Sequence, residues 1–173
     1  LAVLTRVAKE AQWTRPLPAG RGRGISLQES FGSLVAQVVE VTVADGQVAV
    51  ERVVAVIDPG LSVAPDGIAA QLESGIIYGL TAALHGEISI ENGAVAQSNF
   101  DDYKSVRMNE APLIETYVIN SGHDIGGAGE PGTPGIAPAL ANAVFDATGL
   151  RIRQLPLGNF DLNYQAEESG VVG

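Results

Sequence analysis

The chain contains no cysteine and only two histidines among its 173 residues. Without thiolates it can form no disulfide, and it can supply no ligand to an iron–sulfur cluster or to a zinc–thiolate site. His85 and His123 are too few for a histidine-based metal cluster. We therefore expect any metal at this chain to be held by ligands that do not come from the protein, and we assign no metal-ligating residue.

Basic residues are scarce, and long apolar runs are absent. Ten Lys and Arg residues stand against 20 Asp and Glu residues, which gives a net charge of −10. A nucleic-acid partner is not expected, because phosphate binding needs concentrated positive charge. No run approaches the roughly 18 apolar residues of a membrane helix, so we expect no membrane span. With 46% hydrophobic residues, the chain is long enough for one domain with a core of its own.

The chain begins with Leu1, and Met108 is its only methionine. We therefore expect that this N-terminus is not a translation start. We expect the chain to be a section of a longer polypeptide.

Hydrophobic spacing predicts helices over residues 1–13, 66–84 and 136–148, with Asp66 as the N-cap of the second. Gly86 and Gly149 follow the ends of the last two, where glycine commonly terminates a helix. Strands are predicted over the ranges 34–43, 47–57 and 113–119. Hairpins interleaved with two main helices, rather than strict strand–helix alternation, predict an α+β fold with antiparallel β hairpins.

Two turns are predicted between strands. Asp45-Gly46 is a strong two-residue hairpin signal between the first two strands. A second hairpin is expected across residues 91–93, flanked by 87–90 and 94–97.

Proline or glycine stands at every second position of residues 16–24, which predicts a linker. Arg21 and Arg23 within it could bind an anion, although a GxGxG pattern without a preceding strand is weak support for a phosphate loop. We expect an N-terminal helix and linker at 1–20, a main subdomain at 21–157 and a tail at 158–173. The tail has little periodicity, and we expect it to contact another part of an assembly or to be partly mobile.

The stretch from Gly126 to Gly149 places a glycine-rich loop before the last helix. Its glycines lack a Cβ atom, so the backbone can approach a bulky ligand closely. Glu130 is the one ionisable group in the loop, and a carboxylate near the positive end of a helix dipole predicts a site. The alternative is a tight turn in which Glu130 only caps the helix.

Gln71 lies on a face of the middle helix that differs from its apolar stripe, together with Ser74, Gly75, Tyr78 and Gly79. Small residues beside an amide would let a large planar group come close, while the amide supplies a donor and an acceptor. Ordinary packing of the helix explains the same pattern.

Two polar pairs are weaker candidates. Arg107 and Glu110 fit a salt bridge on a solvated face or the lining of a substrate entrance. His123 and Asp124 precede the glycine loop, but without a nearby serine or cysteine nucleophile they form no catalytic triad, and a surface loop is expected.

Several of these motifs, in this order, resemble the molybdenum hydroxylases, the xanthine dehydrogenase and aldehyde oxidoreductase family. The likeness is to the C-terminal part of the molybdopterin-binding large subunit, above all in isoquinoline 1-oxidoreductase-like members, and it runs from about Leu1 to Leu157. The residues that carry it are GRGRGISLQESFGSLVAQVVEV, VVAVIDPGLSVAPDGIAAQLESGIIYGLTAAL, SNFDDYKSVRMNEAPLIE and GGAGEPGTPGIAPALANA. The last matches the family's GxGE-P and P-A-x-A-N-A signature.

The resemblance implies a molybdenum–pterin cofactor, either molybdopterin or its cytosine dinucleotide form, bound by Gln71, Gly127 and Gly129. It implies that Glu130 is the catalytic base, which takes a proton from the hydroxide on molybdenum. It further implies that the substrate is an aldehyde or an N-heteroaromatic compound, which gains the oxygen at an electron-poor carbon and gives up a hydride from that carbon. Ser74 departs from the family's Q-x-E-G motif, which puts the closeness of backbone approach there in question.

The resemblance also implies partners: the remainder of the subunit, a [2Fe-2S] subunit, and a haem or flavin electron-transfer protein. The expected function is that of one segment of an oxidoreductase, inactive by itself, in a bacterial cytoplasm or periplasm. A non-catalytic cofactor-binding or assembly module of the same fold is the alternative. An independent anion-binding protein that uses the GRGRG and GGAG loops is weaker, given the acidic balance.

Overall fold

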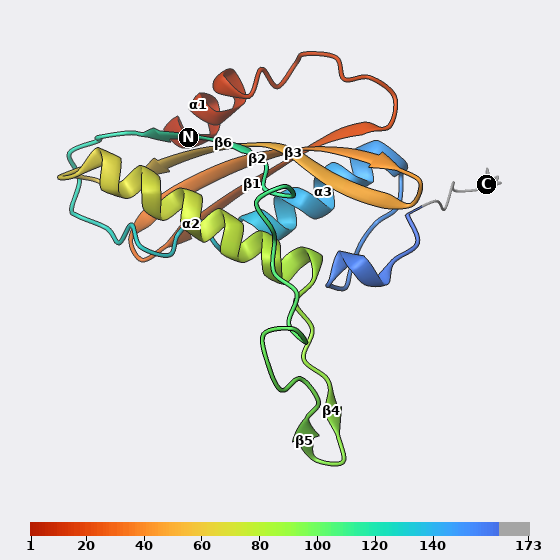
Figure 1. Cartoon of the computed structure of the whole chain (residues 1–173). Helices are drawn as coiled ribbons and strands as arrows, with labels where there is room; N and C mark the ends of the chain where they lie inside the picture. Colours follow the sequence, from red (N-terminus) through yellow and green to blue (C-terminus); the bar gives the residue numbers. More distant parts are fainter. Residues whose placement is uncertain (163–173) are drawn as a thin grey trace, which may run out of the picture.

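The computed structural model describes residues 1–162, and within them a four-stranded sheet organises the molecule. The strand order is β1-β2-β3-β6 (Figure 1). β1, β2 and β3 form an antiparallel meander, and β6 pairs in parallel with β3. The bounds are β1 Arg21–Ser30, β2 Ser33–Ala44, β3 Gln47–Asp58 and β6 Leu113–Val118. The predicted α+β class is confirmed.

Two-residue turns join the meander. Asp45 and Gly46 have φ values of 50° and 73°, the left-handed conformation that this tight hairpin turn requires at both positions. The predicted hairpin is therefore confirmed. Phe31 and Gly32 make a second such turn, with φ values of 55° and 74°, between β1 and β2.

β1 corrects the prediction of a linker over residues 16–24. Residues from Arg21 onward pair with β2 along its length. Gly22 and Gly24 lie against α3, where an added Cβ would collide with backbone atoms of Ala139 and Ala143. The glycines therefore allow close helix-on-strand packing rather than a flexible connection.

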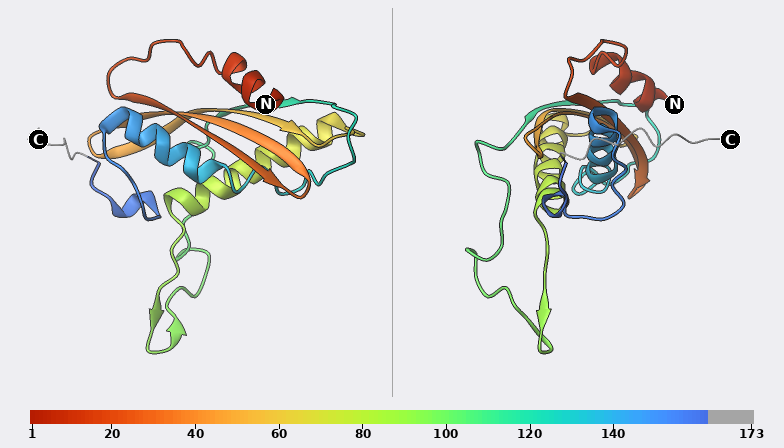
Figure 2. Two further views of the ribbon diagram at one scale, coloured as in Figure 1. Left: turned by 180° about the vertical axis from the view of Figure 1, so that it is seen from behind. Right: turned by 90° about the vertical axis from the view of Figure 1, so that its right-hand side faces the viewer.

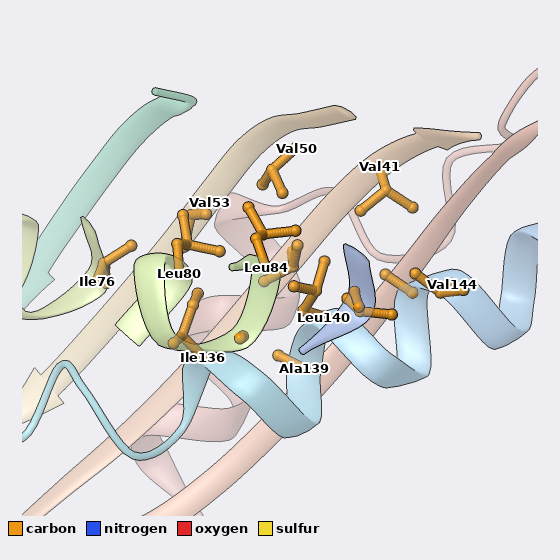
Figure 3. Packing of buried hydrophobic residues seen from close by; sticks show 14 of the residues in the cluster. Val41, Val50, Val53, Ile76, Leu80, Leu84, Ile136, Ala139, Leu140 and Val144 are labelled. Atoms are coloured by element: carbon orange, nitrogen blue, oxygen red, sulfur yellow. The ribbon is translucent and has the colours of Figure 1, made fainter. Parts of the chain in front are cut away.

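Helices cover both faces of the sheet (Figure 2). α1 (Ala2–Glu10) packs on one face, and α2 (Pro65–Leu84) and α3 (Ile136–Thr148) pack on the other. Figure 3 shows the main core between the sheet and the α2/α3 layer, where Val53 and Leu80 meet Ile136 and Leu140. Because both faces are covered, β3 reads as a nearly continuous apolar run.

The ends of α2 and α3 follow the predicted signals with one exception, whereas α1 ends at Glu10, before the predicted end at residue 13. α3 has the predicted bounds, and Gly149 ends it with a φ of 76°. α2 begins at Pro65 with Ala64 as its N-cap, so Asp66 lies inside the first turn and is not the predicted cap. Proline is well suited to a first helical position, because its missing N–H needs no partner there.

A long excursion leaves the body after α2. We call residues 86–106 the arm (Figure 1). It contains the predicted hairpin, but its strands are only β4 (Ile90–Glu91) and β5 (Ala94–Val95), shorter than expected. The turn at Asn92 and Gly93 has positive φ at both residues.

The chain then returns to the main core. Leu157 and Leu162 are buried there, and Leu157 belongs to the short 3-10 helix η1 (Leu157–Asn159). The first residues of the predicted tail thus pack against this chain itself, and residues 163–173 lie outside the described part. Within residues 1–162, no helix is both long enough and apolar enough to cross a membrane.

Candidate functional site

Gln71 and Glu130 open onto one hollow of about 530 Å³, which we call the Glu130 groove. Its walls come from α2, from the β1–β2 turn and from the glycine loop before α3. The lining residues are Phe31, Gln71, Ser74, Gly75, Tyr78, Gly129, Glu130, Thr133 and Pro134. The fold therefore brings together the two polar residues that the sequence singles out, although they are far apart along the chain.

The strands hold the glycine loop through its carbonyl groups. Gln28 Nε2 donates to the Pro131 oxygen at 2.6 Å, and Gln37 Nε2 donates to the Gly132 oxygen at 2.7 Å. Ser33 Oγ donates to the Gly127 oxygen at 2.6 Å. The loop backbone next to Glu130 is thus tied to β1 and β2.

Sequence reasoning missed these supporting residues. The available signal is that Gln37 is a polar residue inside a strongly apolar strand, and it proves to be fully buried. A buried amide requires a hydrogen-bond partner. Its partner lies 95 residues further along the chain, and no local pattern can indicate it.

The Glu130 side chain is exposed, and it does not cap α3. The N-cap of α3 is Gly135, and no acidic residue lies in the first turn of the helix. The Glu130 carbonyl instead accepts a hydrogen bond from Thr133 N at 2.9 Å, which closes a turn before the helix. The alternative in which Glu130 only caps α3 is therefore wrong.

The two loop glycines have different surroundings. A Cβ at Gly129 would meet nothing within 4 Å, so this position leaves open space in the groove. A Cβ at Gly127 would lie 2.8 Å from Phe31 Cβ, and Gly127 N donates to the Phe31 oxygen at 2.7 Å. Gly127 therefore lets the loop pack on the β1–β2 turn.

The residues on the Gln71 face of α2 also differ in their exposure to solvent. Gln71, Ser74 and Tyr78 are exposed along the groove, whereas Gly75 and Gly79 are buried. A Cβ at Gly75 would lie 3.2 Å from Thr133 Oγ1, and one at Gly79 would lie 2.8 Å from the Thr133 oxygen. The packing alternative therefore holds for these glycines, which make room for the chain's own loop.

The groove suits a cofactor whose own atoms bind its metal ion. It offers an amide with donor and acceptor, one carboxylate, and a glycine position with free space. Across residues 1–162, no group of three or more His, Cys, Asp or Glu side chains is placed to hold a metal ion. A pterin cofactor whose sulfur atoms hold the metal fits this donor set.

The weakly supported possibility that Arg23 binds an anion is not borne out, because its side chain is buried and paired. The Arg23 side chain is 5% exposed, and its Nε donates to Glu40 Oε1 at 3.1 Å. Its Nη1 donates to the Trp13 oxygen at 2.6 Å. Arg21 Nε donates to Thr42 Oγ1 at 3.2 Å. Arg23 is thus occupied in holding the segment before β1 onto the sheet.

The expected ion pair between Arg107 and Glu110 is also replaced. Glu110 Oε1 lies 3.4 Å from Lys104 Nζ, and its other oxygen accepts a hydrogen bond from Arg107 N. That backbone hydrogen bond, followed by Lys104, lowers the pKa of Glu110. His123 and Asp124 lie exposed on a loop, as predicted.

A second hollow, of about 370 Å³, lies between the start of β3, the end of α2 and η1. His85 and Glu110 line it, and burial lowers the pKa of His85. The Glu130 groove remains the candidate site, because it unites the two residues chosen for their chemistry.

Comparison with known proteins identifies the family. A family model described as the molybdopterin cofactor-binding domain matches residues 6–112. The chain belongs to this family. The resemblance to the molybdenum hydroxylases is confirmed. The chain is a molybdopterin cofactor-binding domain of the type found in oxidoreductases of that family.

Individual relatives agree with this assignment. The isoquinoline 1-oxidoreductase subunit beta of Brevundimonas diminuta is 34% identical over 90% of this chain and 21% of its own length. A second relative, from Gluconacetobacter polyoxogenes, is named as a membrane-bound aldehyde dehydrogenase with pyrroloquinoline quinone. It is 31% identical over 93% of this chain and 22% of its own length. This molybdopterin-binding chain thus spans about a fifth of the length of these curated relatives.

A solved structure agrees as well. Reconstituted CO dehydrogenase from Oligotropha carboxidovorans matches with a TM-score of 0.64 and 26% identity. The match covers 72% of this molybdopterin-binding chain and 17% of that one.

Proposed function

We propose that this chain is the C-terminal segment of the molybdenum-cofactor-binding subunit of a hydroxylase or dehydrogenase. Its substrates would be aldehydes or N-heteroaromatic compounds, oxidised with oxygen derived from water. The observation that carries the proposal is the convergence of Gln71 and Glu130 on one groove in a molybdopterin-binding fold. The names of the isoquinoline and aldehyde relatives support the two substrate classes.

The residues of this chain would divide the work. When bound, a molybdenum–pterin cofactor supplies the two-electron oxidation. The Gln71 amide would hydrogen-bond the cofactor, and Gly129 would leave space for it. A Glu130 carboxylate oxygen would accept the proton from the water-derived oxygen that is transferred to the substrate.

The supporting hydrogen bonds matter for this role, because a general base must lie within hydrogen-bond reach of its proton. Gln28 and Gln37 hold Pro131 and Gly132, the two residues that follow Glu130. The backbone that carries the carboxylate is therefore fixed from the strand side, while Glu130 itself is exposed and lines the groove.

The rest of the enzyme lies on other polypeptide segments under this proposal. The chain has no cysteine, so [2Fe-2S] clusters would be on a partner subunit, with a haem or flavin protein as a further electron carrier. The remainder of the subunit would complete the cofactor and substrate site. Residues 1–20, 21–157 and 158–173 would be its N-terminal helix and linker, main subdomain and tail.

Glu130→Gln in the full enzyme tests the base directly. Turnover should fall by at least about 100-fold, because general-base catalysis commonly contributes that much or more, while molybdenum measured by elemental analysis stays at the wild-type level. Glu29→Gln is the control, since Glu29 is exposed on β1 and does not line the groove. It should leave turnover unchanged.

Other results would separate the alternatives. Near-normal turnover in Glu130→Gln would refute the base and favour a non-catalytic cofactor-binding or assembly module. An enzyme free of molybdenum that contains a quinone would refute the cofactor itself.

A further inference from the structure

The arm exposes apolar side chains far from the body of the molecule. Phe100 is 93% exposed, Ile90 is 64% exposed and Val95 is 54% exposed. Both views in Figure 2 show the hairpin standing clear of the sheet and of its helices. Ile90 and Val95 are paired across the hairpin, and neighbouring exposed apolar side chains are typical of an interaction surface.

The arm has little internal support. Its two strands have two residues each, and a two-stranded hairpin alone is at best marginally stable in water. Ser89 exchanges hydrogen bonds with the Gln97 side chain, and its carbonyl oxygen accepts one from Ala96 N. Ser98 Oγ donates a hydrogen bond to Asp102. None of these buries the apolar side chains.

Hydrogen bonds between the arm and the body are found at its base. Val106 N donates to Thr81 Oγ1 at 3.2 Å, and Asn159 Nδ2 donates to Glu87 Oε2 at 3.1 Å. These contacts anchor the two ends and leave the hairpin uncovered. A surface that buries Phe100 and Ile90 must therefore come from outside residues 1–162.

The charge of the arm narrows the choice of partner. The arm contains Glu87, Glu91, Asp101 and Asp102, and its single basic residue, Lys104, is paired with Glu110 at its base. A complementary surface is apolar at its centre and basic at its rim. A second copy of the chain is a poor candidate, since it brings a net charge of −10.

We propose that the arm docks into an apolar, basic-rimmed groove on the remainder of the same subunit. This rests on the proposed function, in which the chain is one section of a larger subunit, and on the fact that it spans only 21% to 22% of the curated relatives. Docking would join this section to the rest of the polypeptide through Phe100, Ile90 and Val95, with the acidic residues at the edge of the contact.

Site-specific photocrosslinking in the full-length enzyme tests the contact. Phe100→p-benzoylphenylalanine should cross-link, by mass spectrometry, to a peptide of the same polypeptide outside residues 1–173. Met108→p-benzoylphenylalanine is the matched control, because Met108 is 98% exposed but lies outside the arm. Its yield on that same peptide should be at least about tenfold lower.

Capture of a second copy, capture of another subunit, equal yield from the control or no capture would each overturn the docking proposal. Molybdenum content and turnover are measured on the same preparation. An active molybdenum enzyme without the expected cross-link would refute the docking alone, whereas absence of molybdenum would refute the proposed function.

Discussion

At the scale of single residues, glycine has several distinct roles in this chain. Gly46 and Gly149 adopt positive φ where a turn or a helix end requires it. Gly22 and Gly24 instead lie in a strand, and they allow α3 to touch the backbone of β1. Composition alone makes all of them look like loop residues, and only their neighbours show the difference.

Gly24→Ala should destabilise the chain, because the new Cβ would collide with backbone atoms of Ala139 and Ala143 and force α3 away from β1. A loss of roughly 1–3 kcal/mol in the free energy of unfolding is expected from such overpacking. Chemical denaturation monitored by circular dichroism measures it.

Gly67→Ala is the matched control. Gly67 lies in α2, and an added Cβ there would have only Ala64 Cβ nearby, at 3.8 Å. Since alanine favours helix over glycine by up to about 1 kcal/mol, this variant should be neutral or more stable. Equal destabilisation of the two variants would contradict the packing role of Gly24.

At the scale of elements, a side-chain ion pair supports the pairing of β6 with β3. β6 pairs with only the second half of β3, over Arg52–Ile57. Arg52 Nε donates to Glu115 Oε1 at 2.6 Å across this pair. That hydrogen bond is the main reason why the pKa of Glu115 is lowered.

Glu115→Gln should therefore remove a pH-dependent part of the stability. A lowered pKa in the folded state stabilises the fold at pH values above the ordinary 4.5, and the effect is lost as pH falls through the lowered pKa. The difference in unfolding free energy between wild type and variant should be largest at neutral pH and should shrink in acid. Urea denaturation across this pH range measures it.

Glu29→Gln provides the comparison, since Glu29 is exposed on β1. Its difference from wild type should stay small throughout. A Glu115→Gln difference that is independent of pH would show that the carboxylate charge is not what stabilises the β3–β6 pair.

At the scale of the whole molecule, Glu40 connects one helical layer to the sheet. It accepts hydrogen bonds from Arg15 and Arg23, which belong to the segment after α1 and to β1. Arg52 of β3 lies 3.5 Å away and also donates to the Glu10 oxygen at the end of α1. One buried carboxylate thus forms ion pairs with arginines from both flanking strands.

Glu40→Gln should destabilise the fold by about 3 kcal/mol or more, because the charge on the nearly buried Arg23 would lose its partner. Glu51→Gln is the control, since Glu51 is exposed and lies 3.9 Å from Arg21. Its cost should stay below about 1 kcal/mol. Thermal unfolding of both variants decides between a buried network and a surface pair.

Short-range signals in the sequence determined the elements that the chain forms by local preference. The bounds of α3, the Asp45-Gly46 hairpin and the α+β class follow from periodicity, helix-terminating glycine and positive-φ turn residues. Contiguous motifs likewise indicated the family, and the motif around Gln71 lies within residues 6–112, which the family model matches.

Tertiary structure decided what each of these residues contacts. Three examples depend on packing in the folded chain. Arg23 pairs with Glu40, and Gln37 donates a hydrogen bond to Gly132. Gly75 and Gly79 face the chain's own loop. Such contacts join segments far apart in the chain. They are selected because buried polar groups need partners and apolar faces must be covered, requirements that no local pattern encodes.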